Sequence, residues 1–484
     1  MYMYASGARA SVSTRGGSVI REEVGMKNIL SKIDELARYH NEVSPDLVRA
    51  KDIKLGLRNP DGSGVVVGIT SKGEVIGYER TRREDGSFVV KPVQGRLYYC
   101  GYDAVKLARS IHDEDRFGFE EVAYLLLTGE LPTVEDLDNF TRVLAKKRSL
   151  TRLERSILMQ EAQNDNQMFA LHAVISHFSR CDPNPVSIAI GDVIENCISL
   201  IAKLPTVVAY NYHVSRYRNG SDLMMLQPDP ELSMAENFLY LLKGQRPSRK
   251  EALLFDLALM LHAEHGGGNN STFAVRTVSS SGANTYMAIC AGIASLSGHL
   301  HGGANEAVMM MMRDIRKNVR DWESRKQVRS YLEKILDKKA YDGAGKIYGM
   351  GHAVYTLSDP RCAILKEKVQ EHLLRKEQLQ ELRLMDLVAE VASELLYERK
   401  GQVVSPNVDF YSGFVYKILG IPIDLFTPIF AMSRVVGWSA HRIEQIIQAK
   451  LIRPAYVTSL HGESEYVPLR ERKPAEGPEQ AKAS

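Results

Sequence analysis

The chain has 484 residues, of which 44% are hydrophobic and 25% are charged, and its formal net charge is +3. This length allows about two or three domains with a large core, and the average composition excludes a disordered chain. The nearly balanced charge argues against a nucleic-acid-binding protein, and no apolar run reaches the roughly 18 residues that span a membrane. The five cysteines are scattered and never form a CxxC pair, which argues against zinc ribbons and a disulfide framework.

The first residues of the chain are basic and rich in serine. The segment MYMYASGARASVSTRGGSVIR holds three arginines, four serines and no acid, a composition typical of organelle transit peptides. Met26, however, begins a second plausible start, MKNILSKIDELARYH. We therefore expect residues 1–30 to be a disordered leader and the protein to be cytoplasmic, with an organelle as the alternative location.

One region has the alternating apolar and polar pattern of β-strands. It comprises GVVVGITSKGEVIGYER, with a turn at Lys72–Gly73, and SFVVKPVQGRLYYCGYD. We expect a small β hairpin sheet over about residues 64–100.

Helical signals dominate the rest of the chain. FEEVAYLLLTGELPT predicts a helix that ends at Gly129, and capping boxes at Ser233–Glu236 and Ser248–Glu251 begin two more. The second box opens KEALLFDLALMLH, which is apolar nearly all round and therefore predicted to be buried. The expected fold class is mainly α, with two helical domains and the small N-terminal hairpin sheet.

Changes in composition predict the division into domains. From about residue 315 to 400 the sequence is charge-rich, and it becomes apolar again near residue 408. We expect a large helical domain of residues 31–305 and 415–470, with a small helical domain of residues 306–414 inserted into it. The polar residues 471–484 are expected to form a disordered tail.

Two glycine-rich segments place histidines at helix ends. In HAEHGGGNNST an apolar helix leads to His265, and in LSGHLHGGANEA a helix of small residues leads to His301. Glycines let a ligand approach the backbone, and a histidine there can donate to a developing negative charge. Either motif alone is more often an ordinary turn. His262 and His265 lack a third ligand nearby, so no metal site is expected.

Three further segments add a carboxylate, a histidine and arginines. GMGHAVYTLSDPR contains His352 and Arg361, which suit a substrate with a carbonyl to polarise and a carboxylate to bind. Asp409 lies among apolar residues in NVDFYSGFV, where burial raises the pKa of a carboxyl group towards that of a general base. Arg434 and Arg453 are charges in apolar surroundings. Together these residues point to a polyanionic substrate.

These segments, in this order and spacing, resemble the citrate synthase family from about Gly56 through Arg453. The resemblance implies a helical homodimer whose active site lies between a large domain and a small mobile one. It implies an acyltransferase that condenses acetyl-CoA with oxaloacetate and water to give citrate and CoA. CoA would then be a co-substrate, with no permanently bound cofactor. A 2-methylcitrate synthase that uses propionyl-CoA is the alternative, and a non-catalytic helical scaffold is a distant one.

The resemblance also assigns roles to residues. Asp409 would take a proton from the acyl-CoA methyl group, His301 would hold the resulting enolate, and His352 would polarise the oxaloacetate carbonyl. The residues that would bind oxaloacetate are His265, Arg361 and Arg434, joined by Arg453 of the second subunit. Those that would lie along the coenzyme are Gly349, Gly351 and Ala353.

The spacing of two arginines bears on assembly. Arg453 follows Arg434 by 19 residues, across a helix that separates them at about 1.5 Å per residue. No glycine or tight-turn signal marks the end of that helix, so we expect no sharp turn back. Both arginines can then reach one dicarboxylate only if a second subunit supplies Arg453.

Overall fold

The structure is a computed structural model that describes residues 27–472, with gaps at 28, 40, 42, 85–87, 163, 373–374, 402 and 459–464. Two compact units make up the chain, one of Val66–Arg453 and one of the residues before and after it. The predicted leader and tail lie almost wholly outside the described residues. Both predicted helical domains fall mainly in the unit Val66–Arg453, and the division between them stays a prediction.

The terminal unit contains short helices. Helix α2 (Pro45–Ala50) begins after Ser44, whose hydroxyl accepts a hydrogen bond from the Leu47 N–H. Pro45 occupies its first turn, where no intrahelical N–H bond is lost. Two short 3-10 helices, Leu55–Leu57 and Leu469–Glu471, also belong to this unit.

The predicted hairpin sheet is confirmed as a three-stranded antiparallel sheet of β1 (Gly73–Arg82), β2 (Phe88–Tyr99) and β3 (Tyr102–Asp103). The predicted turn at Lys72–Gly73 is wrong, because β1 starts at Gly73 and pairs with β2 from there to Arg82. The preceding residues form no strand, since the Ser71 N–H donates to the Glu444 carboxylate at 2.8 Å rather than to a neighbouring strand.

Helices form the rest of this unit, as predicted. Their bounds are α3 (Ala104–Asp113), α4 (Phe119–Thr128), α5 (Val134–Lys147), α6 (Arg152–Glu161), α7 (Gln167–Phe178), α8 (Ile190–Arg218), α9 (Met234–Lys243), α10 (Arg249–His262), α11 (Asn270–Ser280), α12 (Thr285–Leu296), α13 (Ala304–Asn318), α14 (Arg325–Leu336), α15 (Pro360–Glu371), α16 (Lys376–Lys400), α17 (Val408–Ile418) and α18 (Phe426–Gln448). Short 3-10 helices lie at Ser179–Cys181 and Ile423–Leu425. The capping boxes of α9 and α10 and the left-handed Gly129 after α4 are confirmed.

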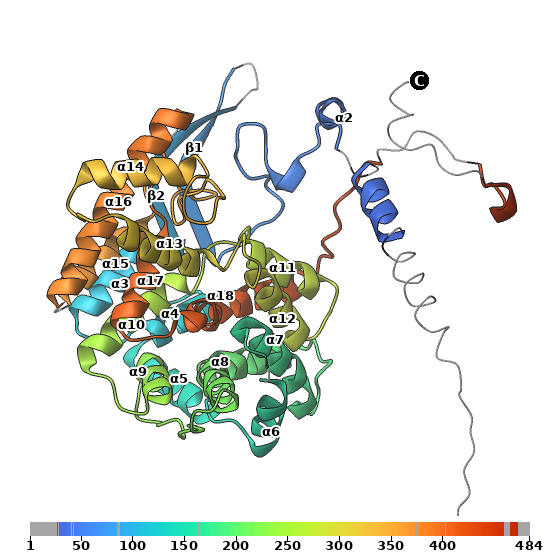
Figure 1. Cartoon of the computed structure of the whole chain (residues 1–484). Helices are drawn as coiled ribbons and strands as arrows, with labels where there is room; N and C mark the ends of the chain where they lie inside the picture. The colour runs from blue at the N-terminus through green and yellow to red at the C-terminus, as the bar shows by residue number, and fades with distance from the viewer. Residues whose placement is uncertain are drawn as a thin grey trace, which may run out of the picture. The chain divides into compact units, whose positions relative to one another are not determined.

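Helix α18 lies at the centre of the helical packing. It contacts α4, α8, α10, α11 and α12, which surround it in Figure 1. Small residues permit these close approaches: a Cβ on Gly292 of α12 would lie 2.9 Å from the Trp438 ring of α18. Helix α8 is long and apolar enough to cross a membrane, but 67% of its apolar window is buried in the fold, as in the core helix of a globular domain.

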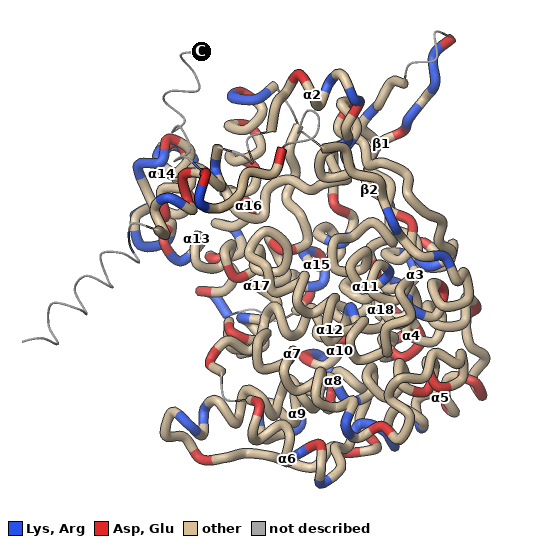
Figure 2. The backbone as a smooth tube through the Cα atoms, turned by 90° about the vertical axis from the view of Figure 1, so that its right-hand side faces the viewer, with Lys and Arg blue, Asp and Glu red and all other residues tan. Residues whose placement is uncertain are grey.

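The charge-rich region forms a second group of helices. Helix α13 packs on α17, α14 on α16, and α15 on α17, and both α15 and α17 also contact α10. Ion pairs such as Arg329–Glu398 join α14 to α16, and basic and acidic residues are interspersed along α14 (Figure 2). The predicted domain boundary at 414–415 falls inside α17.

Candidate active site

Two of the predicted site histidines lie face to edge. The rings of His265, after α10, and His352, before α15, have centroids 5.0 Å apart. Tyr355 completes the group, with its ring 4.7 Å from that of His352 and 5.5 Å from that of His265. Burial, helped by the nearby Arg361, holds the pKa of His265 well below its usual range, so this ring is neutral.

The protonated nitrogen of His352 is fixed by the local backbone. Its Nδ1 accepts hydrogen bonds from the N–H groups of Val354 at 3.0 Å and Tyr355 at 3.1 Å. An acceptor nitrogen carries no proton, so Nε2 carries the proton of the neutral ring. His352 therefore offers Nε2–H as a hydrogen-bond donor.

His301 carries its proton on the other ring nitrogen from His352, because the start of α11 binds its Nε2. Its Nε2 lies 3.3 Å from the Ser271 backbone nitrogen, which donates to it, and 3.0 Å from Ser271 Oγ. Trp438 of α18 donates to the same Oγ at 3.2 Å. Burial and the nearby Arg434 lower the pKa of His301 to about 4. The ring is thus neutral, and Nδ1 carries its proton.

Arg361 forms a buried bidentate ion pair at the start of α15. Its Nε and Nη2 donate to the two carboxylate oxygens of Asp359 at 3.0 and 2.7 Å. Asp359 also caps α15 and accepts the N–H of Val408, the first residue of α17, at 3.0 Å. Burial opposes both charges, but the pairing outweighs it, lowering the pKa of Asp359 and raising that of Arg361. This pair therefore joins the start of α15 to the start of α17.

Arg434 differs because most of its hydrogen-bonding capacity is unused. The side chain is fully buried in α18, and its Nε donates to the His262 carbonyl at 2.6 Å. Both terminal nitrogens, Nη1 and Nη2, lack a partner among the described residues. Burial lowers its pKa to about 10, so the group remains charged at neutral pH. Buried donors of this kind are costly unless an anion binds them.

Asp409 has a carboxylate that no donor among the described residues binds. It occupies the second position of α17, after Asn407, whose side chain accepts the Asp409 N–H at 3.0 Å. Within the described part of the chain, no hydrogen bond or ion pair reaches its carboxylate oxygens. Burial raises the pKa of Asp409 to about 6, although Arg361 and Arg434 both act to lower it. Such a group can accept a proton near neutral pH.

The predicted coenzyme segment is tied to the strand-like residues that lead into Asp409. The Gly351 N–H donates to the Ser405 carbonyl at 2.8 Å, and the Asn407 N–H donates to the Gly349 carbonyl at 2.9 Å. Gly349 has a φ of +76°, and a Cβ there would lie 2.6 Å from Val308 Cγ2, so only glycine fits. Ala353, farther along the segment, is exposed.

Arg453 is the one predicted site residue that the structure does not bring to this group. It is exposed at the end of the unit, and no hydrogen bond or ion pair among the described residues joins it to the other candidate residues. The end of α18 has a turn that the sequence did not signal. Ala449 adopts a left-handed conformation with a φ of +51°, and the Ile452 N–H donates to Ser280 Oγ at 3.1 Å. The chain thus turns towards the C-terminal end of α11 without a glycine.

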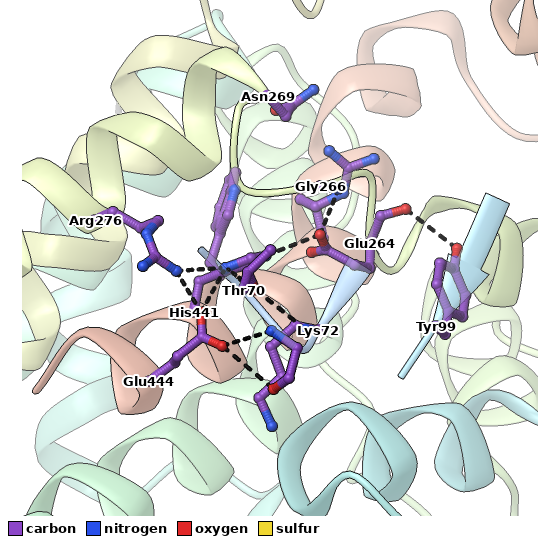
Figure 3. Close-up of polar contacts among 12 residues, drawn as sticks. Thr70, Lys72, Tyr99, Glu264, Gly266, Asn269, Arg276, His441 and Glu444 are labelled. Carbon is purple, nitrogen blue, oxygen red and sulfur yellow. Dashed lines mark hydrogen bonds and ion pairs between the residues drawn. The ribbon is translucent and has the colours of Figure 1, made fainter. Parts of the chain in front are cut away.

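Several residues that organise this site were not singled out from the sequence. Asp359 and Tyr355 stand inside the quoted GHAVYTLSDPR segment, and the Asp-Pro pair that caps α15 is a recognisable signal. Ser271 lies in the quoted GGGNNST segment. Glu264, next to His265, pairs with His441 of α18 (Figure 3), and no periodicity or spacing links residues 177 positions apart.

The geometry agrees with comparisons to known proteins. The family model described as citrate synthase, C-terminal domain, matches residues 76–455. The chain belongs to the citrate synthase family. It is 38% identical to the citrate synthase of Haloferax volcanii over 382 residues, which is 78% of this chain and 93% of that relative.

Solved citrate synthases share the fold. That of Thermotoga maritima superposes with a TM-score of 0.68 and 32% identity over 87% of this chain and 100% of its own. That of Thermoplasma acidophilum, solved in a ternary complex with carboxymethyl coenzyme A and oxaloacetate, shares 24% identity and a TM-score of 0.70 over 87% of this chain and 99% of its own. The predicted mainly α fold and the predicted family are therefore confirmed.

Proposed function

We infer that this chain condenses acetyl-CoA with oxaloacetate and water to give citrate and CoA. The observation that carries the inference is the buried Arg434, whose two terminal nitrogens have no hydrogen-bond partner among the described residues. Two neutral histidines, His265 and His301, and the Asp409 carboxylate of raised pKa lie near it. Oxaloacetate supplies two carboxylates for such donors and a carbonyl for a neutral N–H. Membership of the citrate synthase family supports the same reaction.

In the first step, Asp409 removes a proton from the methyl group of acetyl-CoA. A thioester methyl group is a far weaker acid than a carboxyl group, so the enolate must be stabilised as it forms. His301 is suited to this task, because its neutral ring offers Nδ1–H while Ser271 holds Nε2. The negative charge that develops on the thioester oxygen then strengthens this hydrogen bond.

In the second step, the enolate carbon attacks the oxaloacetate carbonyl. His352 donates a hydrogen bond from Nε2–H to the carbonyl oxygen. This oxygen gains one proton, which balances the one that Asp409 removed, and becomes the hydroxyl oxygen of citryl-CoA. His265, Arg361 and Arg434 hold the two carboxylates. Water finally cleaves the thioester, and citrate and free CoA leave.

The coenzyme is proposed to lie along residues 347–353. Support comes from Gly349 and Gly351, whose backbone hydrogen bonds to Asn407 and Ser405 link this segment to the residues before Asp409. The solved structure of the Thermoplasma acidophilum enzyme is a ternary complex with carboxymethyl coenzyme A and oxaloacetate.

We further propose a homodimer in which Arg453 completes the partner's site. Support comes from the exposure of Arg453 and from the absence, among the described residues, of a hydrogen bond or ion pair that joins it to the other candidate residues. Mixing inactive Arg453→Ala and Asp409→Ala subunits should restore activity, because each heterodimer then has one site free of both changes. No recovery after confirmed subunit exchange would contradict the shared site.

The reaction is tested by following thiol release from acetyl-CoA and from propionyl-CoA in the presence of oxaloacetate. We expect a higher kcat/KM for acetyl-CoA. A higher value for propionyl-CoA would make the enzyme a 2-methylcitrate synthase, and no thiol release from either would overturn the proposed function.

A further inference from the structure

Glu264 is a fully buried carboxylate immediately before His265. Its Oε1 accepts hydrogen bonds from His441 Nε2 at 2.9 Å and from the Gly266 N–H at 2.5 Å (Figure 3). Burial raises the pKa of Glu264, but His441 and Arg434 more than offset this and lower it overall. The carboxylate is therefore ionised, and its two hydrogen bonds hold the backbone directly after His265.

The backbone around this carboxylate is shaped to leave room for it. A Cβ on Gly73, at the start of β1, would lie 2.6 Å from Oε1 of Glu264. A Cβ on Gly437, within α18, would lie 2.2 Å from Oε2. Neither glycine has a positive φ, so space rather than conformation requires glycine at both positions. The strand and the helix thus enclose a cavity fitted to one carboxylate.

His441 is itself held in place. Arg276 of α11 donates to its Nδ1 at 3.0 Å, which leaves Nε2 to carry the proton donated to Glu264. Arg276 also pairs with Glu444 at 2.5 Å, and Glu444 accepts the Ser71 N–H at 2.8 Å. The network therefore connects α11, α18 and the residues before β1, as Figure 3 shows.

This network binds the chain at Gly266 and at Arg276. The residues between them and directly before them carry two proposed active-site contacts. At one end, the Gly266 N–H is bound directly after His265. At the other, Arg276 fixes α11, whose first turn contains the Ser271 groups that orient His301. A shift of this segment would move the His265 ring and the Ser271 donors together.

We propose that Glu264 is a positioning residue for the active site, which holds the 265–271 segment so that His265 and His301 face the substrates correctly. This inference rests on the proposed function. Glu264 touches neither substrate in this account, and it acts through the hydrogen bonds that its Oε1 accepts.

Two substitutions separate these hydrogen bonds from the charge. Glu264→Gln keeps an acceptor oxygen for both Gly266 and His441, whereas Glu264→Leu leaves both donors unpaired. We expect Glu264→Leu to lower kcat/KM for oxaloacetate by about 10- to 100-fold, the loss expected for unpaired buried donors. The kcat/KM of Glu264→Gln should be at least about tenfold higher than that of Glu264→Leu.

Glu154→Leu is the matched control. Glu154 is also buried and accepts hydrogen bonds from the Thr151 N–H and from Lys203, but its helix α6 carries no candidate site residue. Its loss should change kcat/KM by less than about threefold in the folded enzyme. Hydrogen exchange followed by mass spectrometry should become faster in the peptide 265–271 for Glu264→Leu and stay unchanged there for Glu154→Leu.

The proposal is overturned if Glu264→Leu matches Glu154→Leu in both measurements, or if Glu264→Gln is as impaired as Glu264→Leu. If Glu264→Leu does not fold, His441→Leu replaces it in the kinetic and hydrogen-exchange measurements, because this substitution removes a donor to Glu264. Hydrogen exchange needs no substrate. A wild-type enzyme without thiol release would therefore overturn the proposed function, while the exchange data would still test the hold on this segment.

Discussion

Two carboxylates of this chain, the fully buried Glu264 and the half-buried Asp409, have opposite surroundings. Glu264 accepts two hydrogen bonds on one oxygen and fills a space enclosed by two glycines, and its pKa is lowered. Asp409 accepts no hydrogen bond from the described residues, and burial raises its pKa to about 6. Arg434 lowers the pKa of both groups, so the cation alone does not set them apart.

The difference lies in the hydrogen-bond donors. Donors that bind a carboxylate stabilise its charged form and fix its orientation, which makes it a weak base and a firm support. A buried carboxylate without donors is a stronger base and is free to take a proton from a substrate. We therefore propose two different tasks for the same side-chain chemistry: support in the α10–α11 connection and proton transfer at the start of α17.

The largest effect is expected for Asp409→Ala, which removes the base. Thiol release should fall by about 10²- to 10⁴-fold, the usual contribution of general base catalysis. Calorimetric titration should show nearly unchanged oxaloacetate affinity, because Asp409 acts on the other substrate. An equal loss of activity in Glu264→Gln would break the distinction between the two carboxylates.

His301→Ala should follow, with a loss of about 10²- to 10³-fold in kcat, as for other donors to a developing oxyanion. KM should change much less, since the interaction strengthens only as the enolate forms. Steady-state kinetics with acetyl-CoA tests this. An effect confined to KM would mean that His301 binds only the ground state.

Arg434→Met should weaken oxaloacetate binding by about 10- to 100-fold, because charge-assisted hydrogen bonds to a carboxylate are lost. It should also raise the pKa of Asp409, since Arg434 acts to lower it. Calorimetry measures the first effect and the pH dependence of kcat the second. Unchanged oxaloacetate affinity would show that another group binds the dicarboxylate.

Gly437→Ala should give the smallest effect, a loss of about 1–3 kcal/mol in stability from overpacking against Glu264. Glu264→Ala in the same chain would remove the contact of the new methyl group with Oε2, although its contact with the Ala263 carbonyl oxygen at 2.5 Å would remain. Thermal unfolding of both variants and of the double variant should therefore show that the two losses are not additive. Strict additivity would mean that Gly437 does not serve the carboxylate.

Local signals in the sequence were enough to predict much of the fold. The caps of α9 and α10 and the hairpin sheet depend on neighbouring residues, and the structure confirms them. The start of β1 could not be predicted, because Ser71 is bound by Glu444, far along the chain. The turn at Ala449 was missed because a non-glycine residue adopts the left-handed conformation there.

The candidate site could likewise be predicted from the sequence only in part. Motifs and family resemblance supplied His265, His301, His352, Arg361, Arg434 and Asp409, which lie on separate segments that the fold brings into one region. Their protonated nitrogens could not be predicted, since these depend on backbone N–H groups near each ring. The Glu264–His441 pair could not be predicted from the sequence, because it forms only when α18 packs against the end of α10.

The pH dependence of kcat/KM for acetyl-CoA tests the central claim most directly. Asp409 must be ionised to act as a base, and its pKa is raised to about 6, so activity should be full above that pH. Below it, activity should fall about tenfold per pH unit. Glu264→Gln should keep the same inflection, because Glu264 is not the base. Activity that persists down to about pH 4, the range of an ordinary aspartate, would contradict the account.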